Sequence, residues 1–333
     1  MEHLFVATLS LSILALSFFW FIKAISKSNS KNPPLPPGPR GLPIVGYLPF
    51  LGQNLQHPFA GLGQKYGPIY KLRLGTKLHV VISSPSLVKE VVRDQDATFA
   101  NRDVHVAALV ASYDGNDLAW APNDTQWRGM RKMFVREILS TANLEASYNL
   151  RKDEVRRAIR HAGAKIGTRV GISELIFMTE LNVIMSMVWG GTLEKEEQER
   201  VGAEFWALVS RLNDQIGRPN VSDFFPILAG LDIQGIKKET ERLVKSIDGI
   251  FDRIVQKRKT KMCGPMDLSE GRKDYLQILL ELKEKEDSKM SISDRQFKAL
   301  LLREIGIKAY LLGPVASPVQ IVVMSRPVYS RRS

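Results

Sequence analysis

The chain has 333 residues, 44% of them hydrophobic, and 47 Lys and Arg against 35 Asp and Glu give a formal net charge of +12. This composition is sufficient for a substantial core, and the single cysteine excludes an intrachain disulfide framework. The five histidines never occur at metal-ligand spacing, which argues against a helical zinc site. The positive charge suits an acidic partner or simply a solvated surface, and no nucleic-acid-binding module is visible.

The N-terminal residues 1–22 contain an uncharged apolar run from Leu4 to Ile22. As a helix this run would span roughly 28 Å, about the hydrocarbon thickness of a bilayer. Basic residues follow the run and none precedes it, so the positive-inside rule places the remainder of the chain in the cytosol. We therefore predict a single-pass membrane anchor over residues 1–22.

Residues 23–56 are basic and rich in proline, with the block Pro-Pro-Leu-Pro-Pro-Gly-Pro at 33–39. Prolines cannot continue a helix and favour an extended chain, so this segment is predicted to be a stiff hinge.

The next residues predict a small β-region. Ile69 to Leu74 and Leu78 to Ile82 have the composition of two strands of a hairpin that turns at Gly75-Thr76. Ser84 is a suitable N-cap for a helix that continues to about Asp94. Residues 95–122 carry scattered Gly, Asn, Asp and Pro without a sustained period, which indicates a long loop with one short helix.

From residue 125 onward the chain is predicted to be mostly helical. Gly190-Gly191 is a stop signal, and Ser293 with Gln296 forms a capping box. Val319 to Met324 could form a strand, but no partner for it is evident. The resulting fold class is α+β, predominantly helical, with a small β-hairpin region. Apolar residues at three- and four-residue spacing predict helices near 125–138, 144–164, 173–189, 195–216, 235–261, 274–286 and 293–304.

Short motifs follow the apolar run, its basic flank and the proline block in a fixed order. They are His57-Pro58-Phe59, Lys65 to Ile69, Phe99 to Arg102, Trp127 to Lys132, Val221 to Pro226 and Leu231 to Gly235. The whole series resembles the plant microsomal cytochrome P-450 family of haem-thiolate monooxygenases, and the chain is most similar to the group containing geraniol and other monoterpenol hydroxylases. The resemblance implies a partial P-450 domain over residues 57–302, followed by a divergent tail over 303–333.

The resemblance assigns a cofactor role to Trp127 and Arg131. The two residues lie four apart on a predicted helix and therefore share one face. In the family, the Trp and Arg of this helix bind a haem propionate, and a planar guanidinium suits a carboxylate. Without the resemblance, a core Trp beside a surface Arg would be the simpler interpretation.

The same helix is implied to face a redox partner. Arg128, Lys132 and Arg136 correspond to the family region that contacts an acidic reductase, through which NADPH would act only indirectly. Ordinary solvated charge is an equally good interpretation of these three residues.

The loop after residue 101 resembles the family's first substrate-recognition segment. Val104, Val106, Ala108 and Leu109 would then line a pocket for a small lipophilic substrate. A short buried helix without ligand contact is the alternative. The stretch from Asp223 to Leu231 resembles a linker that dips into the membrane surface.

The family's axial ligand is absent from the sequence. Its motif is Phe-x-x-Gly-x-Arg-x-Cys-x-Gly, and the only cysteine, Cys263, has Gln256, Lys259, Lys261 and Pro265 at the four other defined positions. Ile233 replaces the Thr expected after Ala229 to Asp232. The Glu-x-x-Arg matches at Glu239, Glu154 and Glu197 are predicted to be surface pairs.

Two functional interpretations follow. In the first, the chain descends from a monooxygenase of the endoplasmic reticulum membrane, with its body in the cytosol, that hydroxylates a small lipophilic substrate such as a monoterpenoid alcohol. That interpretation predicts haem as the cofactor but an inactive chain, because the thiolate ligand and the oxygen-activating motifs are missing. In the second, the chain is a non-catalytic membrane-anchored fragment.

Overall fold

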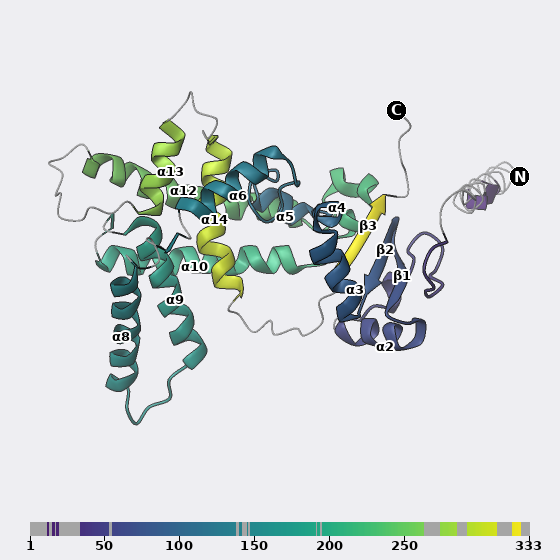
Figure 1. Ribbon diagram of the computed structural model, residues 1–333, viewed down its shortest axis with the longest axis horizontal. Helices are drawn as coiled ribbons and strands as arrows, with labels where there is room; N and C mark the ends of the chain where they lie inside the picture. The colour runs from purple at the N-terminus through teal and green to yellow at the C-terminus, as the bar shows by residue number, and fades with distance from the viewer. Residues whose placement is uncertain are drawn as a thin grey trace, which may run out of the picture. The chain divides into compact units, whose positions relative to one another are not determined.

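The computed structural model of the chain consists of two compact units (Figure 1). The N-terminal unit comprises residues 1–94 and 319–333, and the helical unit comprises residues 95–318. The residues that the structure describes are 12, 15, 16, 18, 19, 34–52, 55–137, 140, 141, 145, 147–190, 192, 193, 195–262, 274–284, 292–311 and 322–327.

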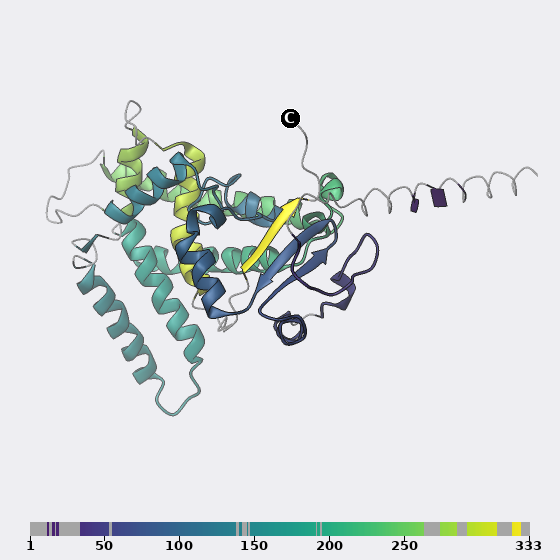
Figure 2. The ribbon, with the colours of Figure 1, turned by 45° about the vertical axis from the view of Figure 1, so that its right-hand side comes forward.

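The N-terminal unit is built around a three-stranded antiparallel sheet in the order β1-β2-β3 (Figure 2). β1 and β2 form the predicted hairpin, with Leu74 opposite Lys77 and a left-handed Gly75 (φ 57°) in the turn, so this prediction is confirmed. The elements of the unit are η1 (Leu48–Phe50), α2 (Gln56–Tyr66), β1 (Ile69–Leu74), β2 (Lys77–Ile82), α3 (Pro85–Lys89), the π-helical η2 (Glu90–Asp94) and β3 (Val322–Pro327).

The third strand comes from the C-terminal part of the chain. β3 lies antiparallel to β2, with Val80 opposite Met324. The sequence pattern predicted a strand near Val319 to Met324 without a partner, and the structure supplies β2 as that partner. The exposed hydrogen-bonding edge of the β1-β2 hairpin is thereby paired over its whole length.

The side chains of the hairpin alternate between the core and the surface. Tyr70, Leu72 and Leu74 of β1 are buried while their neighbours are half-buried. The Tyr70 hydroxyl donates a hydrogen bond of 3.0 Å to the Phe59 carbonyl of α2. Burial raises the pKa of Tyr70 to about 12, with a smaller contribution from Tyr47, so this phenol remains protonated as a donor.

The proline block runs beside the first strand. The Lys71 amide donates to the Pro37 carbonyl at 2.8 Å, and the Tyr47 amide donates to the Arg73 carbonyl at 2.7 Å. Gly46 is left-handed (φ 64°), and a Cβ at this position would collide with the Arg73 carbonyl. The close approach of this segment to β1 therefore requires glycine at position 46.

The helical unit contains long helices that agree closely with the sequence periodicity, so the predicted α+β, predominantly helical class is confirmed. Figures 1 and 2 show α8 and α9 side by side. The elements are α4 (Asp96–Phe99), α5 (Val106–Ala111), α6 (Thr125–Glu137), α8 (Tyr148–Ala164), α9 (Ile172–Trp189), α10 (Lys195–Gly217), α11 (Val221–Phe224), η3 (Pro226–Leu231), α12 (Ile236–Met262), α13 (Tyr275–Glu284) and α14 (Asp294–Leu311).

Two of the predicted helix boundaries are made by the expected groups. α9 ends at Trp189, directly before Gly190. At the start of α14, the Gln296 amide donates to the Ser293 hydroxyl at 3.3 Å, and the Ser293 amide donates to the Gln296 side chain at 2.8 Å. These reciprocal bonds confirm the predicted capping box. α14 continues past residue 302, where the predicted domain ends, to Leu311.

An aromatic cluster joins α9, α10 and α12. The Trp189 and Phe205 rings meet edge to face with centroids 6.5 Å apart, and the Phe205 and Phe251 centroids are 5.8 Å apart. All three side chains are at most 1% exposed and belong to the main core of the unit. Aromatic pairs of this geometry stabilise a core beyond the area that they bury.

The predicted localisation, a single-pass membrane protein, is contradicted by the described structure. The anchor over residues 1–22 on which it was based falls mostly outside the described residues. Within the described part of the chain, no helix combines the length and the apolar character needed to cross a membrane. Such a helix requires about 20 mostly apolar residues in succession. Of residues 1–22, only Ser12, Ala15, Leu16, Phe18 and Phe19 are described, and the others lie outside the described residues.

The aromatic cluster yields a stability prediction. Phe205→Ala should lower the free energy of unfolding by about 3–5 kcal/mol, because it removes a buried ring and leaves a cavity between three helices. Urea denaturation followed by circular dichroism measures this change. Ile227→Ala is the matched control, since Ile227 is 91% exposed, and should change stability by less than about 0.5 kcal/mol. Equal effects of the two substitutions would contradict the assignment of the core.

Candidate functional site

Trp127 lies in the first turn of α6. The Asp124 carboxylate accepts a hydrogen bond of 2.8 Å from the Trp127 amide and thereby caps the helix. The indole is half-buried against the main core. Its Nε1–H donates to the Leu118 carbonyl at 3.1 Å, so the ring is fixed to the segment that precedes α6.

Arg131 lies one turn further along the same face of α6. Its guanidinium carbon is 5.4 Å from the centroid of the Trp127 ring, within the range of a cation–π interaction. The Arg131 side chain is exposed. Among the described residues, no carboxylate or carbonyl accepts a hydrogen bond from this guanidinium, so its donors face solvent.

Trp127 and Arg131 differ in how readily each could donate a hydrogen bond to a haem propionate. The Arg131 guanidinium is held near one position by the indole but retains its free donors, which is the arrangement required to bind a carboxylate. The Trp127 N–H is already bonded to Leu118, so a propionate would have to share or replace that bond. The structure thus offers Arg131 as the direct partner and Trp127 as the surface on which Arg131 rests.

The other basic residues of α6 lie on its exposed side. The Arg128 Nε donates to the Asn123 side chain at 3.2 Å, which links it to the turn before the helix. Arg128, Lys132 and Arg136 are all exposed. Their role as a reductase contact stays a prediction.

The predicted substrate segment forms the short helix α5. Ala108 is fully buried, Val104 and Val106 are half-buried, and Leu109 is 41% exposed. α5 packs against α10 and α12. At its start, the Val106 amide donates to the Asp223 carboxylate at 2.8 Å, although the two residues are 117 positions apart. Their role in binding a substrate stays a prediction.

A polar cluster that the sequence did not reveal secures the chain after α5. The Tyr113 hydroxyl donates to Asp248 of α12 at 2.5 Å. Lys298 of α14 pairs with Asp248 and with Asp252, each at 3.3 Å. Because Tyr113, the two aspartates of α12 and Lys298 come from three separate parts of the sequence, only the tertiary structure brings them together.

In this cluster the Tyr113 phenol and the Lys298 amine are both protonated, as their contacts with Asp248 require. Burial raises the pKa of Tyr113 far above its usual value, and the hydrogen bond to Asp248 acts in the same direction. Burial alone would lower the pKa of Lys298, but the charges of Asp248 and Asp252 raise it. The phenol therefore remains a donor and the ammonium remains charged around neutral pH.

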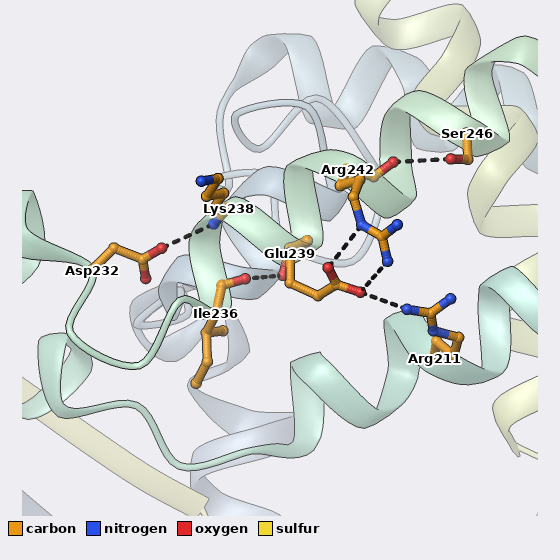
Figure 3. Close-up of polar contacts among 8 residues, drawn as sticks. Arg211, Asp232, Ile236, Lys238, Glu239, Arg242 and Ser246 are labelled. Atoms are coloured by element: carbon orange, nitrogen blue, oxygen red, sulfur yellow. Dashed lines mark hydrogen bonds and ion pairs between the residues drawn. The ribbon is translucent and has the colours of Figure 1, made fainter.

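The Glu-x-x-Arg match at Glu239 and Arg242 is a surface pair, as predicted. Figure 3 shows the Glu239 carboxylate bonded to Arg242 on its own helix and to Arg211 of α10. The distances are 2.9 Å and 2.8 Å, and Arg242 is 62% exposed. The bond from Arg242 is the main cause of the lowered pKa of Glu239. This carboxylate therefore joins α10 to α12.

The two other Glu-x-x-Arg matches behave differently from each other. Glu154 is buried and pairs with Arg157 at 2.9 Å, so its carboxylate does not lie on the surface. Glu197 pairs with Lys257 of α12. The Glu154 prediction was wrong in its burial, because α9 packs against α8 and the Glu154 side chain is only 8% exposed.

Asp232 caps α12. It has a left-handed backbone (φ 40°), and its carboxylate accepts hydrogen bonds of 3.0 Å from the Lys237 and Lys238 amides. Figure 3 shows the bond from Lys238. The Asp of the Ala-Gly-x-Asp match thus has a structural role at the start of the helix.

The neighbouring η3 exposes Ile227 and Leu231, and the predicted contact of 223–231 with a membrane surface stays a prediction. Cys263 lies outside the described residues.

Comparison with known proteins gives matches over most of the chain. A family model described as Cytochrome P450 matches residues 36–304. The chain is 31% identical to a ferruginol synthase of Isodon rubescens and 32% identical to a sugiol synthase of Salvia miltiorrhiza. It is 30% identical to a tabersonine 16-hydroxylase of Catharanthus roseus.

These matches cover much of this chain but only part of each relative. The aligned regions span 84–86% of the chain and 57–58% of the three relatives. A zebrafish cytochrome P450 solved with progesterone has the same fold over 77% of this chain and 58% of its own, with a TM-score of 0.58 and 19% identity.

The Tyr113–Asp248 hydrogen bond should control the mobility of the segment after α5. Tyr113→Phe removes the donor, and the loss of a charge-assisted bond of about 1.5–3 kcal/mol should accelerate amide exchange in residues 106–119 by roughly 10- to 100-fold. Hydrogen exchange read by mass spectrometry measures this. Tyr148→Phe is the control, since Tyr148 is 55% exposed. Unchanged exchange in the Tyr113→Phe chain would show that the bond does not order this segment.

Proposed function

Because the chain belongs to the cytochrome P450 family, we propose that the complete protein is a haem-dependent monooxygenase and that this chain contributes its propionate-binding helix. The observation that supports this proposal most directly is the Arg131 guanidinium, placed 5.4 Å from the Trp127 ring centroid with its donors open. A cation resting on an aromatic ring but without a carboxylate partner is prepared to receive one.

The residues of α6 would act by holding the cofactor. Arg131 would donate to a haem propionate, and Trp127 would keep the guanidinium in place while its own N–H remains near Leu118. When bound, the haem supplies the chemistry of oxygen activation. This chain would contribute by orienting the haem, since a charge-assisted hydrogen bond to one propionate restricts how the cofactor can rotate in its site.

We propose a small lipophilic substrate, with a monoterpenoid alcohol as the specific candidate. The support is the apolar composition of α5 and of the chain just before it. The proposed contacts are Val104, which precedes α5, and Val106, Ala108 and Leu109 of α5. Leu109 is the exposed member and thus the one free to meet a ligand. One relative is named as a tabersonine 16-hydroxylase, so hydroxylation is the reaction to test.

An NADPH-dependent reductase is the proposed electron donor. The exposed Arg128, Lys132 and Arg136 give α6 a basic surface for an acidic partner. NADPH itself would then bind the reductase, not this chain.

The sequence also supports a second proposal about this chain taken alone. Its only cysteine, Cys263, lacks the Phe, Gly, Arg and Gly of the haem-ligand motif. We therefore propose that these 333 residues do not hydroxylate a substrate without the axial thiolate. A non-catalytic fragment that retains part of the P450 surface is the alternative function.

Haem titration tests the role of Arg131. Arg131→Ala should weaken haem binding to the full chain by roughly 10-fold, because one charge-assisted hydrogen bond is lost. Soret absorbance and quenching of tryptophan fluorescence measure the affinity. Arg156→Ala is the matched control, since Arg156 is an exposed arginine of α8 paired only with its neighbour Asp153 among the described residues.

Titration with a haem whose propionates are esterified shows whether Arg131 acts through the propionate charge. Without the carboxylate charge, the wild-type chain and the Arg131→Ala chain should bind this haem equally. If Arg131→Ala weakens both haems to the same degree, the residue acts through folding and the proposed propionate contact is wrong.

A further inference from the structure

A cavity of about 530 Å³ lies at the end of the α10–α12 pair opposite to Arg211 and Glu239. The turn after α9, the first turns of α10 and the last turns of α12 line it. This volume is within the range of small-molecule pockets. The cavity belongs entirely to the helical unit and is made by residues distant from Trp127 and Arg131 in the sequence.

The floor of the cavity is apolar. Leu193, Val201, Ile250 and Ile254 line it, and each is at most 7% exposed. These side chains also belong to the main core of the unit, so the floor is rigid and not a loose surface depression. An occupant must therefore present an apolar body to this floor.

One buried hydroxyl in the cavity lacks a partner. Thr192 lines the cavity, is 1% exposed, and its Oγ1 makes no hydrogen bond to any residue in the described part of the chain. A buried hydroxyl without a partner is unfavourable, and most are satisfied in native proteins. A ligand that brings an acceptor to Thr192 would remove this cost.

The rim of the cavity carries three basic side chains, two of which are paired with carboxylates. Arg253, Lys257 and Lys261 line it together with one acidic residue, Glu197. Lys257 holds the Glu197 carboxylate, and Arg253 holds Glu204 of α10 at 3.0 Å. The two pairs fix Arg253 and Lys257 at the mouth, where an anionic head would share the donors of these side chains with the carboxylates already bound to them.

We propose that this cavity binds a lipophilic carboxylate, with the apolar body on the Leu193–Val201–Ile254 floor and the carboxylate at the basic rim within reach of Thr192. The apolar floor would contact the apolar body of the ligand, and the basic rim would attract its negative charge. The Thr192 hydroxyl would donate a hydrogen bond to the carboxylate. This site is separate from the proposed haem contact and does not depend on it.

Isothermal titration of the full chain with three probes tests the chemistry of the ligand. Decanoate, decanol and decylammonium share one apolar body and differ in head group. Decanoate should bind about 10-fold more tightly than decanol, decylammonium should not bind, and the decanoate affinity should fall as salt is raised. Equal binding of decanoate and decanol would overturn the proposal.

Two substitutions locate the binding. Thr192→Val preserves the shape and removes the hydroxyl, so it should weaken decanoate about 5-fold while the melting temperature stays the same or rises. Val201→Phe should block the cavity. Thr179→Val is the matched control, because its hydroxyl is already satisfied by the Leu175 carbonyl at 2.7 Å. Decanoate affinity that is unchanged in both Thr192→Val and Val201→Phe would place the ligand elsewhere and refute the site.

Discussion

The antiparallel packing of α10 against α12 is the constraint on which the helical unit depends. Phe205 and Phe251 meet at its centre, and the Trp189 ring adds the end of α9. Ion pairs lie on both sides of this centre, with Glu239 bound to Arg211 at one end and Glu197 bound to Lys257 at the other. Exposed pairs of this kind contribute little stability individually, so we assign the energy to the aromatic contacts and the register to the charges.

The same helix pair supports the proposed site. Asp248 of α12 accepts the Tyr113 hydroxyl, and Lys298 of α14 completes the cluster. Through Tyr113 the segment between α5 and α6 is joined to the core, and Leu118 in that segment accepts the Trp127 indole. The position of the Arg131 guanidinium on the Trp127 ring therefore rests on a chain of contacts that begins at α12. The floor of the cavity between the first turns of α10 and the last turns of α12 consists of residues of the same core.

Local sequence patterns predicted the helices, the hairpin and the capping box of α14, because each depends on residues a few positions apart. They did not predict contacts such as Asp223 with Val106, 117 positions away, or Tyr113 with Asp248. The position of a single carboxylate or phenol in the sequence does not indicate which distant residue it will contact. The pairing of β3 with β2 was missed for the same reason. The apolar run predicted as an anchor illustrates the converse, since composition alone indicated a span that the described helices do not provide.

We propose that this chain retains the propionate-binding helix of the cytochrome P450 family without its thiolate ligand. The reduced, CO-bound spectrum of the haem-reconstituted full chain tests it most directly, because thiolate ligation shifts the Soret band to the red. We predict haem binding without that shifted band, and no spectral change on Cys263→Ala. A shifted band in the wild-type chain that disappears with Cys263→Ala would contradict the account.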